Sequence, residues 1–79
     1  MVRLQVLGVG CDKCDKLAEN AAQAARELEL DFELVKVTRI EEIKRFHIIA
    51  LPALVVDGVV KSVGRLPDVE AIKRLLARP

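Results

Sequence analysis

The spacing of apolar residues along the chain predicts an alternation of strands and helices. Residues 3–7 form a short apolar run of the kind that makes a buried strand. The segment from about Cys11 to Glu29 repeats apolar residues at helical spacing, and Phe32–Val37 has the composition of a second strand. Because a helix lies between these two strands, we expect them to be parallel and joined by a right-handed crossover.

The long helix has an apolar face made mostly of alanine. The residues that we expect to face the core are Cys14, Leu17, Ala18, Ala21, Ala22, Ala25 and Leu28. The largely opposite face carries Asp15, Glu19, Gln23, Arg26 and Glu27. Since alanine side chains are small, this helix is expected to pack very close to a sheet.

After the second strand, Thr38 and Glu41 have the spacing of a capping box that opens a short helix ending near Phe46. The buried side of this helix is expected to hold Ile40, Ile43 and Phe46. An apolar strand, Leu51–Val56, then contains a proline near its start. This part of the chain therefore predicts a helix that leads into a strand.

The last third of the chain predicts a hairpin and a final helix. Asp57-Gly58 is a two-residue turn of the type that closes hairpins, and residues 59–63 form the returning strand. The segment 64–67 interrupts the pattern, and Asp68 is a good N-cap for a helix. Its inward residues are expected to be Val69, Ile72, Leu75 and Leu76. The predicted order is βαβ, then α, then ββα, within a single α/β domain spanning residues 1–79.

The composition narrows the classes of function. The 79-residue chain is 52% hydrophobic, has no Trp or Tyr, and carries 13 basic and 12 acidic residues for a net charge of +1. Because it contains no basic block, nucleic acid is not expected as a partner. No signal peptide and no apolar run of membrane-spanning length is present, so we expect a cytoplasmic protein without a membrane partner.

Two cysteines carry the candidate chemistry. Cys11 follows Gly10 at the start of the long helix, where unpaired N–H groups and the helix dipole favour a thiolate, which is the reactive form of the thiol. Cys14 lies one turn later on the same side, close enough to form a disulfide with Cys11. In a reducing compartment, such a pair is typical of catalysis or metal binding. The pair predicts a dithiol that exchanges disulfides.

Two other functions use the same residues. Small copper and zinc chaperones also place Cys-x-x-Cys between a strand and a helix, and Cys11 and Cys14 would then be the metal ligands. That class usually has Met two residues before the first cysteine, where this chain has Val9. A redox-sensing adaptor is the third possibility. We expect His47 to be a surface residue that ends the short helix, because nothing in the sequence pairs it with Cys11.

Taken together, these motifs resemble the thioredoxin-like superfamily. The most similar group is that of the very small, glutaredoxin-sized archaeal and bacterial redox-active disulfide proteins. The residues that carry the resemblance are Gly8–Cys14, Pro52–Gly58 and Val63–Arg65, and the resemblance covers essentially the whole chain. It implies a minimal thioredoxin-like fold, with a four-stranded mixed sheet of order 2-1-3-4 flanked by three helices.

The resemblance also implies roles for individual residues. Cys11 attacks a disulfide and Cys14 resolves the mixed disulfide, and no cofactor is expected besides the redox-active Cys11–Cys14 pair. Pro52 follows a cis peptide bond beside the dithiol. Gly10, Leu51, Pro52, Gly64 and Arg65 line the substrate groove. The implied partners are protein disulfides and a reductase of the thioredoxin-reductase type, and the protein is expected to be a monomer.

The chain departs from the better-known members of the superfamily in three places. Gly10 stands where thioredoxins have Trp, and the first strand offers no buried acid beneath the dithiol. The residues Asp12-Lys13 replace the Pro-Tyr of glutaredoxins. Asp12 and Asp15 oppose the favourable effect of Lys13 and Lys16 on a Cys11 thiolate. We therefore expect a reducing potential, nearer about −270 mV than about −120 mV.

Overall fold

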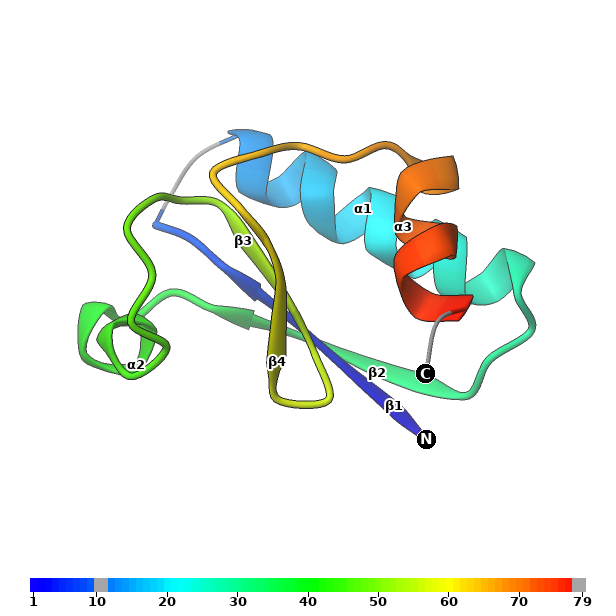
Figure 1. The fold of residues 1–79 in the computed structure, drawn as a ribbon, viewed down its shortest axis with the longest axis horizontal. Coiled ribbons are helices and arrows are strands. Elements are labelled where there is room, and N and C mark those ends of the chain that lie inside the picture. The colour runs from blue at the N-terminus through cyan, green and yellow to red at the C-terminus, as the bar shows by residue number, and fades with distance from the viewer. Residues whose placement is uncertain (10–11, 78–79) are drawn as a thin grey trace.

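The computed structural model describes residues 1–9 and 12–77. The strands are β1 (Val2–Leu7), β2 (Phe32–Val37), β3 (Ala53–Val56) and β4 (Val59–Val63), and the helices are α1 (Asp12–Glu27), α2 (Ile40–Lys44) and α3 (Val69–Ala77) (Figure 1). They occur in the predicted order. Within the described residues, no helix combines the length and the apolar character needed to cross a membrane.

The four strands form one mixed sheet of order β2-β1-β3-β4, which confirms the predicted topology. β1 pairs with β2 in parallel and with β3 antiparallel, while β3 and β4 form the antiparallel hairpin. Asp57 and Gly58 both have positive φ, as a tight hairpin turn requires. Because β1 and β3 are antiparallel neighbours in the centre of the sheet, the end of β1 lies beside the start of β3.

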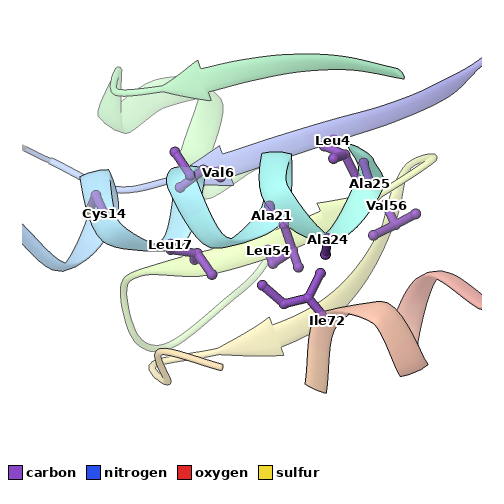
Figure 2. Packing of buried hydrophobic residues seen from close by; sticks show 11 residues of the cluster. Leu4, Val6, Cys14, Leu17, Ala21, Ala24, Ala25, Leu54, Val56 and Ile72 are labelled. Atoms are coloured by element: carbon purple, nitrogen blue, oxygen red, sulfur yellow. The ribbon is translucent and has the colours of Figure 1, made fainter. Parts of the chain in front are cut away.

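One face of the sheet is covered by α1 and α3. Leu4 and Val6 of β1 and Leu54 of β3 point toward α1, whose buried alanines allow close packing (Figure 2). The buried residues of α1 are Cys14, Leu17, Ala18, Ala21, Ala24 and Ala25. The prediction of Ala22 as a core residue was wrong, because the buried face of α1 instead includes Ala24, which belongs to the same cluster as Ile72 of α3. Ala22 is only half-buried.

The other face of the sheet packs against the α2 segment. Leu7, Val37, Ala53 and Val55 form this smaller cluster with Ile43 of α2. Strand β3 is buried on both faces, so its run of apolar residues is continuous rather than alternating. The domain therefore has three layers, with α1 and α3 on one side of the sheet and α2 on the other.

The predicted capping box is wrong. The N-cap of α2 is Arg39, one residue later than the box requires, and its side chain makes no capping hydrogen bond. Its carbonyl instead accepts hydrogen bonds from the N–H groups of Glu42 and Ile43. The helix also ends earlier, at Lys44, and Phe46 lies in the turn that follows. Ile40, expected to be buried, is exposed.

The other helix boundaries follow simple capping rules. The Asp68 carboxylate accepts a hydrogen bond from the N–H of Ala71 at 2.8 Å, so the predicted N-cap of α3 is confirmed. Helix α1 ends at Glu27, before the predicted end at Glu29, because Glu29 adopts a left-handed conformation. Lys73 of α3 contacts Glu27 of α1 at 3.0 Å and ties the two helices together at the surface.

Candidate functional site

The register of the sheet brings three chain segments together beside α1. Leu7, the last residue of β1, pairs with Ala53, the first residue of β3, and Ala53 also pairs with Val63 at the end of β4. The residues just outside the strands, Gly8 and Pro52, therefore become neighbours. The site is built where these strands end and where α1 begins.

Gly8 is the point of closest packing in this site. Its N–H donates a hydrogen bond to the Val37 carbonyl at 3.1 Å, which anchors the chain as it leaves β1. A Cβ placed on Gly8 would collide with Cys14 Sγ, and it would lie 3.1 Å from Cys14 Cβ and 4.0 Å from Pro52 Cβ. The absence of a side chain at Gly8 is therefore what lets the Cys14 sulfur approach the end of β1.

Of the two cysteines, Cys14 lies within the described residues. Cys14 is buried, with 7% of its surface exposed, and it belongs to the core cluster under α1. Cys11 and Gly10, the predicted nucleophile and its neighbour, lie outside the described residues. The roles assigned to them remain predictions.

The predicted groove residues occupy two adjoining loops. The Leu51–Pro52 peptide bond is cis, the isomer that the resemblance implies. Pro52 is buried, whereas Leu51 is 39% exposed. The N–H of Gly64 donates a hydrogen bond to the Pro52 carbonyl at 2.8 Å, which holds the two loops side by side. Arg65 is exposed next to Gly64.

The backbone conformation and the space at position 64 both favour glycine. The φ of Gly64 is +68°, in the left-handed region that favours glycine. A Cβ at this position would also come within 2.8 Å of Ala50 Cβ. Both observations explain why a glycine stands between the end of β4 and Arg65.

The structure adds a lysine that the sequence did not reveal. Lys36 of β2 pairs with Val6 of β1 and reaches across to Asp15 of α1, with Nζ and Oδ1 2.7 Å apart. The hydrogen bond to Asp15 raises the pKa of the Lys36 ammonium, and the charges of Asp15, Cys14 and Glu19 act in the same direction. Lys36 therefore places a cation beside the Asp15 carboxylate, one residue after Cys14.

His47 and the first turn of α1 match their predicted roles. His47 is exposed with a φ of +54°, as expected for a residue that ends the α2 segment. The carboxylates of Asp12 and Asp15 are exposed at the start of α1.

A Gly8→Ala substitution should disturb the dithiol site more than the hairpin. The added methyl forces Cys14 to move, and such overpacking destabilises a domain by about 1–3 kcal/mol. We expect a faster alkylation of Cys14 in this variant, measured by mass spectrometry beside a denaturation curve. The control is Gly58→Ala, which has positive φ but no heavy atom within 4 Å of its new Cβ. An unchanged Cys14 reactivity in Gly8→Ala would contradict the packing argument.

Comparisons with known proteins agree with this architecture. A family model described as a thioredoxin domain matches residues 2–77. The chain is 39% identical over 77 residues to a thioredoxin of Methanothermobacter thermautotrophicus, covering 98% of this chain and 100% of that protein. It is 40% identical over 76 residues to a thioredoxin of Methanocaldococcus jannaschii, covering 96% of this chain and 87% of that protein.

Proposed function

The chain belongs to the thioredoxin domain family, and we propose that it reduces disulfide bonds of partner proteins through Cys11 and Cys14. Family membership supports thiol–disulfide oxidoreduction as the general activity. The observation that carries the assignment to this dithiol is the packing around Gly8, where the Cys14 sulfur lies against the end of β1 beside Pro52. The reducing cytoplasm is the compartment in which we expect the reaction.

The proposed reaction has two exchange steps. The Cys11 thiolate attacks one sulfur of a partner disulfide, and the other partner sulfur leaves as a thiolate that takes up a proton. The Cys14 thiol then loses its proton and attacks the Cys11 sulfur. This step forms the Cys11–Cys14 disulfide and releases the partner in its reduced form. Two electrons and two protons from a reductase restore the dithiol.

The surroundings of Cys14 support its role in the second step. Its burial keeps it from competing with Cys11 for an incoming disulfide, since a partner sulfur would have to enter the core to reach it. Cys11 thus has the role of nucleophile and Cys14 that of resolving thiol.

The proposal is tested by insulin-disulfide reduction with a chemical reductant or a thioredoxin reductase. We expect the protein to accelerate the reaction, and the Cys11→Ser variant to fall to the rate of the blank. His47→Asn serves as the control, because it changes an exposed residue outside the dithiol site and should keep full activity. No acceleration by the unmodified protein would overturn the proposal.

Two further measurements separate the alternatives that share these cysteines. Metal analysis of protein purified under reducing conditions would favour a copper or zinc carrier if it found stoichiometric metal. A protein that is oxidised once but does not turn over with any reductase would favour a redox sensor. Repeated turnover is the result expected for a reductant of protein disulfides.

A further inference from the structure

A groove of about 630 Å³ lies between the edge strand β4 and helix α3. Strand β4 is an edge strand of the described sheet, and its residues Lys61, Ser62 and Val63 line the groove. Residues of the loop that joins β4 to α3 also line the groove, namely Arg65, Leu66 and Pro67. The groove is thus formed by a strand edge, a loop and a helix.

The charge of the groove is entirely positive among the residues that the structure describes. Lys61 comes from β4, Arg65 from the loop and Arg74 from α3, and the described lining contains no acidic side chain. None of the ion pairs between described residues includes any of these cations. By contrast, Lys36 contacts Asp15, and Lys73, next to Arg74, contacts Glu27 and Glu70. The positive charge of the groove therefore remains available to a partner.

Apolar side chains line the same groove. Val63, Leu66 and Leu75 are among the lining residues, and Leu66 is 42% exposed. Mixed apolar and cationic lining suits a peptide segment that alternates acidic and apolar side chains. It suits a nucleic acid poorly, because the described lining contains no aromatic residue on which a base could stack.

One loop links the groove to the candidate dithiol site. Gly64, whose N–H donates a hydrogen bond to the Pro52 carbonyl, is followed directly by Arg65, which lines the groove. An extended partner segment that passes Pro52 would therefore meet Arg65 first and could continue along the groove to Lys61 and Arg74.

We propose that this groove binds an acidic, extended segment of the protein whose disulfide is reduced, and so selects partners by charge. This inference rests on the proposed function, and it adds the class of substrate on which the reaction would act. Carboxylates of the segment pair with Lys61, Arg65 and Arg74, while its apolar side chains contact Leu66 and Leu75.

Direct binding provides a test that needs no redox chemistry. The probe is a short, fluorescently labelled peptide that alternates acidic and apolar residues and contains no cysteine, with a glutamine counterpart as the neutral reference. We expect the acidic peptide to bind more tightly and to lose affinity as salt rises. The double variant Lys61→Gln, Arg74→Gln should weaken its binding about three- to tenfold, as expected for two exposed ion pairs.

A matched control removes the same charge elsewhere. Lys44→Gln, Arg45→Gln changes two exposed cations of the α2 segment, on the other face of the sheet, and should leave peptide binding unchanged. Equal binding of the acidic and glutamine peptides, or an equal loss in this control, would overturn the proposal. An oligonucleotide that binds the groove as tightly as the acidic peptide would also overturn the assignment to a protein segment.

The kinetic test uses two peptide disulfides that differ only in flanking acidic or glutamine residues. We expect the acidic substrate to be reduced faster, and the Lys61→Gln, Arg74→Gln variant to lose this preference while it keeps its rate on the neutral substrate. Equal rates on both substrates would refute selection by the groove. If neither disulfide is reduced but groove-dependent binding persists, the proposed function fails while the acidic-peptide site stands.

Discussion

Cys14→Ser is expected to accumulate as a mixed disulfide between Cys11 and its partner, whereas Cys11→Ser is expected to form none. Without Cys14, the second exchange step has no attacking thiol, so the intermediate persists. Without Cys11, the remaining thiol is buried at 7% exposure and reacts slowly with a large disulfide. Multiple turnover should therefore fall to the blank rate in both variants, while only Cys14→Ser yields a covalent complex.

The complex is measured with insulin as the disulfide partner, by intact-mass spectrometry after the remaining thiols are blocked. Alkylation of the two single-cysteine variants gives an independent comparison of the same thiols, in which Cys11 should react faster. A double variant that lacks both cysteines is the control and should form no adduct. Equal alkylation rates would contradict the assigned roles. A covalent complex through Cys14 in the Cys11→Ser variant would contradict them as well.

Leu54→Ala should remove a large part of the stability of the domain. Leu54 is fully buried in the central strand β3 and faces α1 in the main cluster (Figure 2). Truncating a buried leucine to alanine costs about 2–5 kcal/mol through lost burial and the cavity left behind. Domains have a free energy of unfolding of about 0.05–0.15 kcal/mol per residue, which for 79 residues amounts to about 4–12 kcal/mol.

Urea denaturation measures this loss as a lower midpoint with an unchanged slope. Ile49→Ala is the control, because Ile49 is 97% exposed and should change the stability by less than about 0.5 kcal/mol. If Leu54→Ala does not fold, the gentler Ile72→Val should still lose about 0.5–1.5 kcal/mol. Similar midpoints for Leu54→Ala and Ile49→Ala would contradict the location of the core.

Most of the fold was predictable because each element has a local signal. The hairpin followed from Asp57-Gly58, the cap of α3 from Asp68, and the sheet order from the resemblance carried by the Cys-x-x-Cys and Pro52 segments. The capping box at Thr38 failed because a short motif competes with tertiary packing. The α2 segment is fixed by Ile43 and Phe46 against the sheet, and its N-cap lies at Arg39.

The candidate site was only partly predictable. Cys14 lies near Pro52 because of the register of β1 and β3. The sequence pattern alone does not give this register, and the expectation that Pro52 lies beside the dithiol came from the family resemblance. Lys36 could not be assigned, because its proximity to α1 follows from the pairing of β1 with β2 and from the length of its own side chain. The groove beside β4 was also missed, because Lys61, Arg65 and Arg74 are spread along the sequence and meet only in the folded chain.

The alanine face of α1 has a consequence for conformational entropy. Ala18, Ala21, Ala24 and Ala25 are buried against the sheet and α3. Burying a leucine costs about 0.5–1 kcal/mol in side-chain conformational entropy, whereas an alanine side chain has no such entropy to lose. The helix that carries Cys14 therefore docks with little ordering penalty in its side chains. A small domain can in this way hold its dithiol helix rigidly with a core of modest volume.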